Sequence, residues 1–321
     1  MRAVRLKQLT GPDGLVIEEV DPPVPGPNQI RVQVKATALN RADLLQTMGL
    51  YPAPPGVPAD IPGLEYAGLV DSVGVGVTRW QVGDRVMGLV AGGAWAEQLV
   101  THEREALHVP GQLSFEKAAA IPEAFITAFD ALTLQAGMRA GQTVLIHAVA
   151  SGVGTAALQW AKAIGAKAIG TSRTASKLSR VKLLGLDVGL LVDRNAPKFA
   201  SQVKADLALE LVGGNYLPET IEAMNVGGTV MLVGLTGGPS AELPLRTILT
   251  KRLRIFGTTL RARSLEEKIA VAESFGSQVL PFFAAGILIP VVGSIVKLTQ
   301  LQEALARLAA NETFGKTVVA L

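Results

Sequence analysis

Cysteine is absent from this chain of 321 residues. Without a thiol the chain cannot form a disulfide scaffold, a zinc–thiolate site, an iron–sulfur cluster or a cysteine nucleophile. Histidine is scarce too, and its three positions, His102, His108 and His147, include no pair at the spacing His-x₃-His. A catalytic zinc ion needs Cys, His or carboxylate ligands at fixed spacing. We therefore predict that the protein holds no metal.

The chain also lacks an excess of charge of one sign. Its 30 basic and 27 acidic residues give a formal net charge of +3. So small an excess is weak support for a nucleic-acid partner, and we expect none. Hydrophobic residues make up 49% and charged residues 18% of the chain. This composition supplies a core and carries too little charge for disorder.

Long apolar runs are missing as well. Three stretches without charge, residues 140–161, 223–241 and 274–296, are interrupted by glycine or proline. A helix that spans a membrane needs about 20 mostly apolar residues, so these stretches do not predict one. Residues 1–7 are charged and no apolar run follows them, so no signal peptide is predicted. We expect a soluble, cytoplasmic protein.

The distribution of proline divides the chain in two. Eleven of the 18 prolines lie in the first 110 residues, between short β-rich runs at 30–34, 66–70, 85–87 and 98–100. Short strands separated by glycine and proline predict an irregular β-barrel or sandwich. A chain of this length is expected to form one large domain or two ordinary ones.

From about residue 120 the pattern changes to strand, turn and helix. Strands are predicted at 143–148, 168–171, 188–192, 207–211, 229–233 and 255–259, with helical patterns between the first four pairs. This alternation predicts a parallel, doubly wound sheet and places the chain in the α/β class. Two amphipathic stretches, 265–275 and 301–310, and a last strand at 316–321 follow.

The strongest local motif is the turn Ser151-Gly152-Val153-Gly154 between a buried strand and an amphipathic helix. Free N–H groups at the start of a helix stabilise a pyrophosphate, which makes this turn a candidate dinucleotide site. The motif departs from G-x-G-x-x-G, because Val149 and Ser151 occupy its first two glycine positions. The alternative is a tight turn that only packs the helix on the strand.

The residues after the second strand of this unit indicate which dinucleotide binds. Sites for NAD place Asp or Glu about 20 residues after the glycines, to hold the ribose 2′-hydroxyl. Residues 170–177 contain no acid, and Ser172, Arg173 and Lys177 supply a hydroxyl and two cations suited to a 2′-phosphate. The sequence therefore predicts NADPH. The alternative is a solvated helix start that happens to be basic.

Six ordered segments carry a family resemblance that extends over the whole chain. They are Asn40-Arg41-Ala42-Asp43-Leu44-Leu45, Gly49-Leu50-Tyr51-Pro52, Pro62-Gly63-Leu64-Glu65-Tyr66-Ala67-Gly68, Val82-Gly83-Asp84-Arg85-Val86, Ala119-Ala120-Ile121-Pro122-Glu123 and Ser151-Gly152-Val153-Gly154-Thr155-Ala156, supported by Gly213-Gly214, Gly234-Leu235 and Gly315-Lys316. The chain resembles the zinc-independent medium-chain dehydrogenase/reductases, above all the zeta-crystallin-like NADPH:quinone oxidoreductases.

The resemblance implies two domains with a cleft between them. Residues 1–120 and 263–321 would form a GroES-like, β-rich substrate domain, and residues 121–262 a Rossmann domain that binds NADP. A homodimer through the edge strand of the Rossmann sheet is also implied, here residues 254–260. In zinc-dependent relatives a Cys is expected near Asn40 and a His where Glu65 sits, and both are absent.

The resemblance also suggests residues that contact the acceptor and the nicotinamide. Tyr51 would face the nicotinamide, unless it is a turn aromatic that packs on the barrel. Asn40 would hydrogen-bond a carbonyl substrate or the cofactor, or cap the helix that begins near Arg41. Thr127 would lie near the nicotinamide, or bond a backbone carbonyl within its helix.

The remaining site residues are assigned to the cofactor. Ser151 is assigned both to the catalytic residues and to the cofactor site, into which its hydroxyl would point, together with Gly152, Val153 and Gly154. Arg194 stands where relatives carry an aromatic at the adenosine end, and an arginine there can bind a 2′-phosphate. Further cofactor contacts are assigned to Gly234, Leu235, Leu260 and Arg261. Arg261 and Arg263 would meet a phosphate or merely belong to a loop.

The expected activity is reduction of a small quinone by NADPH, a reaction for which no acid or base residue is obligatory. One alternative is an enal or enoyl-thioester reductase in which Tyr51 protonates the carbon next to the carbonyl. A second, from another class, is a protein that binds NADPH without turnover.

Overall fold

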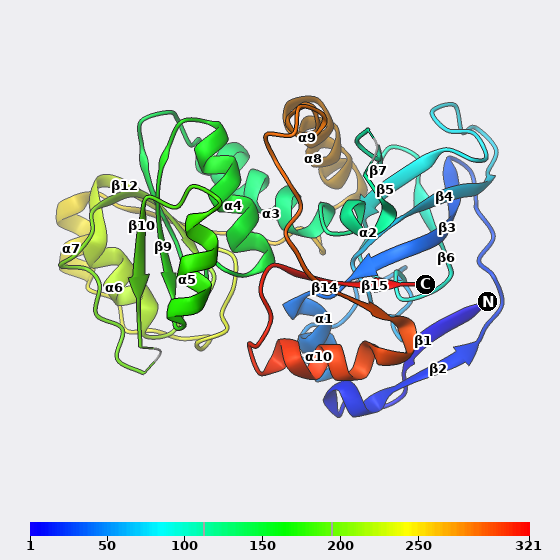
Figure 1. Cartoon of the computed structure of the whole chain (residues 1–321), viewed down its shortest axis with the longest axis horizontal. Helices are drawn as coiled ribbons and strands as arrows, with labels where there is room; N and C mark the ends of the chain where they lie inside the picture. The colour runs from blue at the N-terminus through cyan, green and yellow to red at the C-terminus, as the bar shows by residue number, and fades with distance from the viewer. Residues whose placement is uncertain (112, 194) are drawn as a thin grey trace. The chain divides into compact units, whose positions relative to one another are not determined.

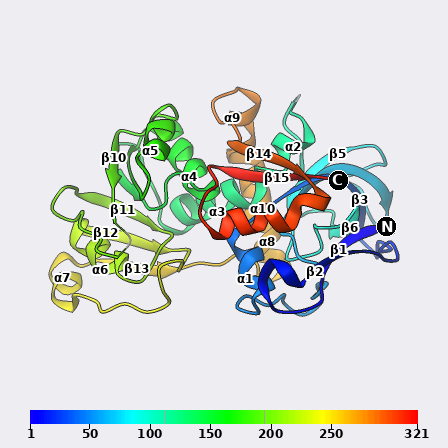
Figure 2. The same cartoon turned by 60° about the horizontal axis from the view of Figure 1, so that its bottom comes forward.

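The computed structural model describes residues 1–111, 113–193 and 195–321. The chain folds into two compact units (Figures 1 and 2). Unit 1 comprises Met1–Ile126 and Leu260–Leu321, and unit 2 is the continuous segment Thr127–Thr259. The sequence placed these limits at residues 120 and 263. Unit 1 is rich in strands and unit 2 alternates strands and helices, so the predicted α/β class is confirmed.

Unit 1 is built on a seven-stranded sheet of order β14-β15-β3-β4-β5-β7, with β6 paired to β3, beside the hairpin β1-β2. The strands are β1 (Arg2–Leu6), β2 (Leu15–Glu19), β3 (Gln29–Ala38), β4 (Glu65–Val73), β5 (Arg85–Leu89), β6 (Gln98–His102), β7 (Ala106–His108), β14 (Val292–Lys297) and β15 (Lys316–Ala320). Alternate residues of β3, Ile30, Val32 and Val34, enter a core with Tyr66 and Trp80, as a half-buried strand requires.

Short helices cover this sheet, and the two chain segments of unit 1 interleave. The helices are η1 (Gly11–Gly14), α1 (Arg41–Thr47), α2 (Phe115–Ala118), the π-helical turn η2 (Pro122–Ile126), α8 (Leu265–Gln278), α9 (Leu280–Ala284), η4 (Leu298–Gln300) and α10 (Leu301–Ala309). Leu301 and Leu305 of α10 pack with Leu44 of α1 and with Trp95. In Figure 1 the C-terminal β15, in red, lies beside the early strand β3, in blue, to which it is hydrogen-bonded.

Unit 2 is an entirely parallel six-stranded sheet of order β10-β9-β8-β11-β12-β13. Its strands are β8 (Thr143–Ile146), β9 (Lys167–Ser172), β10 (Val188–Leu191), β11 (Ala205–Glu210), β12 (Met224–Leu232) and β13 (Arg254–Gly257). Its helices are α3 (Thr127–Phe129), the π-helical η3 (Asp130–Gln135), α4 (Gly152–Ala163), α5 (Ala175–Lys182), α6 (Tyr216–Ala223) and α7 (Leu245–Lys251). The predicted doubly wound sheet is confirmed, and its strand order reverses at β8 and β11.

Three local predictions are wrong. The described residues between β10 and β11 contain no helix, because Pro197 lacks an N–H and restricts the residue before it. A helix, α7, instead connects β12 and β13. It is only seven residues long and none of its residues is fully buried, although Leu245, Ile248 and Leu249 form a short apolar stripe. The edge strand ends at Gly257, and Leu260 belongs to unit 1.

No helix in the described part of the chain is both long enough and apolar enough to cross a membrane.

Candidate functional site

The glycine turn of unit 2 is held in a tight conformation at the start of α4. The Oγ atom of Ser151 accepts a hydrogen bond from the Gly154 N–H at 3.0 Å, so Ser151 caps the helix. A Cβ atom on Gly154 would lie 2.4 Å from the carbonyl oxygen of Ala148, so only glycine fits there. The first amides of a 12-residue helix therefore remain at the turn, where they can bind an anion.

The carboxyl ends of neighbouring parallel strands meet at this edge. Ser172 ends β9 and its Oγ accepts the Thr174 N–H at 3.2 Å, while Arg173 is exposed. Lys177 lies in the first turn of α5. The absence of an acid after β9 leaves this end of the edge suited to a phosphate. Arg194, the other predicted cation, lies outside the described residues.

A hollow of about 300 Å³ opens beside the loops that follow β11 and β12. It is lined by Asn195, Val212, Gly213, Asn215, Tyr216 and Gly237. Gly213 and Gly214 have φ values of 68° and 52°, in the left-handed region that favours glycine. The predicted Gly234 donates its N–H to the Glu210 carbonyl at 3.1 Å, and the predicted Leu235 is half-exposed.

A buried network of polar side chains holds the loops around the hollow in place. His147, fully buried after β8, places its Nδ1 2.9 Å from the Thr171 hydroxyl and its Nε2 2.9 Å from the Thr220 hydroxyl. The Glu210 carboxylate accepts the Thr220 hydroxyl and the N–H groups of Val212 and Gly213. Burial lowers the pKa of His147, so its imidazole is neutral at neutral pH. The network ties β8, β9 and β11 to the loop around the hollow.

In unit 1 a second polar cluster is built around Asn40, Glu65 and Lys316. The Asn40 Nδ2 atom donates to Glu65 Oε1 at 2.9 Å, and the Lys316 ammonium lies 2.6 Å from the same oxygen. Lys316 also donates to the Leu39 carbonyl at 3.0 Å and to Asn40 Oδ1. Asn40 precedes the first residue of α1, but its side chain makes no cap hydrogen bond, because both ends of its amide are engaged by Glu65 and Lys316.

Two further carboxyl groups of this cluster carry raised pKa values. Asp43 is fully buried and its Oδ2 accepts the Asn40 N–H at 2.8 Å; burial raises its pKa to about 7. The Glu123 N–H donates to Glu65 Oε2 at 2.9 Å. Burial, and then the negative charge of Glu65, raise the pKa of Glu123 to about 8.

Tyr51 is held next to the cluster by Arg261. The Arg261 guanidinium donates to the carbonyls of Ala91 (2.7 Å) and Tyr51 (2.8 Å) and to Gln46 Oε1 (2.6 Å). Its Cζ atom lies 5.0 Å from the centre of the Tyr51 ring. Arg261 therefore positions the tyrosine loop, in addition to any role toward a cofactor. Burial, and then the negative charge of Glu123, raise the pKa of the Tyr51 hydroxyl.

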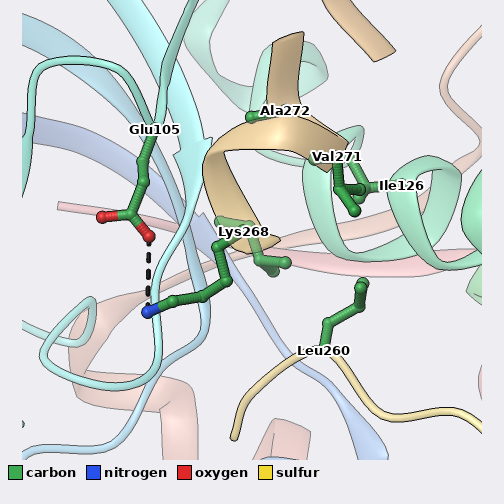
Figure 3. A pocket seen from close by; sticks show the side chains of 7 residues that line it. Glu105, Ile126, Leu260, Lys268, Val271 and Ala272 are labelled. Carbon is green, nitrogen blue, oxygen red and sulfur yellow. Dashed lines mark ion pairs between the residues drawn. The ribbon is translucent and has the colours of Figure 1, made fainter. Parts of the chain in front are cut away.

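The two remaining predicted site residues are Leu260 and Thr127. Leu260 lines a cavity of about 20 Å³ inside unit 1 with Ile126, Val271 and Ala272, beside an ion pair of 3.4 Å between Glu105 and Lys268 (Figure 3). This volume holds about one water molecule. Thr127 is buried at the start of α3. Their contacts with a cofactor stay predictions.

Comparison with known proteins assigns the family. A quinone oxidoreductase of Lama guanicoe is 33% identical over 100% of this chain and 98% of the relative. The chain belongs to the quinone oxidoreductase family. The predicted membership among the medium-chain dehydrogenase/reductases is thereby confirmed.

Family models and solved structures from the wider superfamily match this chain as well. The family described as alcohol dehydrogenase GroES-like domain matches residues 26–111, and the family described as zinc-binding dehydrogenase matches residues 152–276. The structure of Escherichia coli quinone oxidoreductase complexed with NADPH has a TM-score of 0.88, 27% identity and full coverage of both chains. The CurK enoyl reductase has a TM-score of 0.85 and 25% identity, covering 99% of this chain and 98% of that one.

One of these family names implies a bound zinc ion. The residues of this chain do not fit one. Lys316 places a positive charge against Glu65 and Asn40, where a cation would be repelled. No thiol exists in the chain, and the described residues contain no group of three His, Asp or Glu side chains that could hold a metal.

Sequence reasoning missed the charged half of the cluster in unit 1. Asp43, Glu65, Glu123 and Lys316 lie within the segments that carry the resemblance but were not assigned to the site. Their signal is that a charged residue in an otherwise apolar segment must find a partner when it is buried. The partner itself was hidden, because Lys316 and Asn40 are 276 positions apart.

Proposed function

We propose that this protein reduces a small quinone with NADPH bound along the carboxyl edge of the unit 2 sheet. The observation that carries the proposal is the capped glycine turn at α4 combined with a neighbouring strand end, β9, that offers Ser172 and Arg173 and no acid. The family relationship and the NADPH complex of the Escherichia coli neighbour support it. The bound nicotinamide supplies a hydride.

Different residues of the chain are suited to different parts of this dinucleotide. The amides of Gly152 and Val153 suit the pyrophosphate, and Gly154 keeps the turn tight. Ser172, Arg173 and Lys177 suit the 2′-phosphate. The hollow beside Gly213 suits an apolar or ribosyl part. In unit 1, Tyr51 offers its ring to the acceptor, held in place by Arg261. Asn40 acts on the site by holding Glu65 and Lys316.

A turnover assay tests the proposal. Oxidation of NADPH and NADH is followed with 1,4-benzoquinone, an enal and crotonyl-CoA as acceptors, before and after exhaustive dialysis against EDTA. We expect turnover of the quinone with NADPH, unchanged by the chelator because the chain offers no fitting ligand set. Turnover that is lost with EDTA and restored by zinc would contradict the proposal.

Arg173 should determine the choice of cofactor. One charge-assisted hydrogen bond contributes about 1.5–3 kcal/mol, so Arg173→Ala should weaken NADPH binding by about tenfold or more and leave NADH binding almost unchanged. Titration of cofactor fluorescence measures both affinities. The control is Arg180→Ala, which replaces a basic residue in the last turn of α5. Equal affinity of the unsubstituted protein for both cofactors would refute this assignment.

Reduction of an enal or enoyl thioester is the second candidate function. The likeness to an enoyl reductase favours it, as does a Tyr51 hydroxyl whose raised pKa keeps it protonated. The enal and crotonyl-CoA arms of the assay separate this activity from quinone reduction. If neither acceptor is reduced while NADPH binds, the protein is a binder of NADPH without turnover.

We further propose that two copies associate through the β13 edge. Phe256 on this strand and Leu245 and Leu249 on α7 are exposed apolar side chains within unit 2. An unpaired strand edge with such neighbours is a template for pairing with a second copy. Phe256→Glu should shift the protein from dimer to monomer in sedimentation equilibrium. A wild type that is already monomeric at micromolar concentration would refute the dimer.

A further inference from the structure

Glu123 differs from Asp43 and Glu65, the other carboxyl groups of the unit 1 cluster, because its side chain has no hydrogen bond or ion pair among the described residues. The main chain around it is fixed. Glu123 lies in the π-helical turn η2, and its N–H is bonded to Glu65 Oε2. Short π-helical turns are frequent at functional sites. Glu123 as a residue is partly exposed, unlike Asp43 and Glu65, which are fully buried.

Charged and titratable groups from every neighbouring element act on this carboxyl. They are Asp43 of α1, Tyr51 of the proline-rich loop, Glu65 of β4, Arg261 of the segment after β13 and Lys316 of β15. Lys316 is already paired with Glu65, and Arg261 already holds the tyrosine loop. Among the described residues no cation is paired with Glu123, and the charges of Lys316 and Arg261 lower its pKa by less than burial and Glu65 raise it. The pKa near 8 follows from this arrangement, and at neutral pH the group is mostly a neutral acid.

We propose that the Glu123 carboxyl is the proton donor to the reduced acceptor, a role that rests on the proposed function. The quinone gains a hydride, which carries two electrons, from the bound nicotinamide, and the proton of Glu123 forms the second O–H bond of the hydroquinone. The O–H bond of Glu123 breaks in this step. The resulting carboxylate then takes a proton from water.

The alternatives within the cluster are weaker donors. A general acid works best when its pKa lies near the working pH. The pKa of Tyr51 is raised above its ordinary value of 10, which moves it away from neutrality. Asp43 has a suitable pKa, but its side chain is fully buried and cannot touch an acceptor.

Glu123→Gln tests the role, because the amide has the same shape and cannot donate an acidic proton. We expect kcat with the quinone to fall by about 10²-fold, the lower end of what a general acid contributes, with NADPH affinity unchanged. The kcat of the wild type should decrease as pH rises through about 8, and this decrease should vanish in Glu123→Gln. Glu303→Gln, an exposed carboxyl on α10, is the control.

A second readout needs no turnover. The infrared difference spectrum of cofactor-free wild type minus Glu123→Gln should show a protonated carboxyl band at pH 7 that is lost as pH rises, with a midpoint near pH 8. In Asp43→Asn the midpoint should move to lower pH, because the negative charge of Asp43 raises the pKa of Glu123.

The outcomes separate the two proposals. A wild type that reduces no acceptor refutes the proposed function, and this role with it. A wild type that turns over quinone, with Glu123→Gln equal to it in kcat and pH profile, refutes the role of Glu123 alone. Absence of the carboxyl band at pH 7 also refutes the role.

Discussion

Lys316→Met should lower the free energy of unfolding of unit 1 by about 3–5 kcal/mol, the usual cost of removing one partner from a buried ion pair. Lys316 and Glu65 are 4% and 0% exposed, and the ammonium is 2.6 Å from the carboxylate. Without the lysine, Glu65 would be buried next to Asp43 and Glu123 with no cation in contact with it. The Leu39 carbonyl and Asn40 Oδ1 would also lose their donor. Denaturant unfolding followed by tryptophan fluorescence measures the change.

A second substitution separates loss of the pair from loss of packing. In Lys316→Met combined with Glu65→Gln the stranded charge is gone, and we expect much of the lost stability to return. Lys117→Met replaces an exposed lysine on α2 and should change stability by less than about 0.5 kcal/mol. A Lys316→Met protein as stable as the Lys117→Met protein would show that the buried pair does not hold unit 1 together.

Gly154→Ala should destabilise unit 2 by about 1–3 kcal/mol and weaken NADPH binding by at least about tenfold. The added Cβ would lie 2.4 Å from the Ala148 carbonyl oxygen and 2.7 Å from the Val149 Cα atom. Both are backbone atoms of the same turn, so the turn must open and its amides must leave their places. Denaturant unfolding and fluorescence titration with NADPH measure the two effects.

The matched control is another helical glycine. At Gly276 in α8 a Cβ would meet only the Cδ2 atom of the Leu107 side chain, at 3.3 Å. A side-chain end can move aside, and alanine favours a helix by about 1 kcal/mol over glycine. Gly276→Ala should therefore keep its NADPH affinity and its stability. Equal behaviour of the two variants would mean that the close approach at Gly154 does not shape the turn.

The sequence predicted the helices and strands that are marked by a pattern within one short segment. The strand and helix around Ser151 follow from an apolar run, a glycine pair and the spacing of Ala157, Trp160 and Ala161. Helix α7 was missed because its apolar spacing, at Leu245, Ile248 and Leu249, extends over a single turn of a seven-residue helix. The edge strand was drawn three residues too long, because an apolar Leu260 fits a strand as well as it fits the cavity that it lines.

The parts of the site that lie within one short segment could be predicted from the sequence. The helix cap at Ser151 and the missing acid after β9 are properties of short stretches. The roles of Arg261 and Lys316 depend on contacts with Gln46, Tyr51 and Asn40, which lie more than 200 positions away. No periodicity records such pairs. The burial that raises the pKa of Glu123 likewise exists only once distant segments have packed around it.

The pairing of β15 with β3 sets an order of events during synthesis on the ribosome. Translation at about 5–20 residues per second needs on the order of tens of seconds to pass from the end of β3 to Lys316. Throughout that interval Glu65 lacks its ion-pair partner Lys316, and the residues of β3 that pair with β15 have no partner strand. Unit 2 is a single continuous segment and can fold as soon as it emerges. The nascent chain thus contains the complete sheet of unit 2 and the incomplete sheet of unit 1. A chaperone that shields strand edges would bind the incomplete sheet.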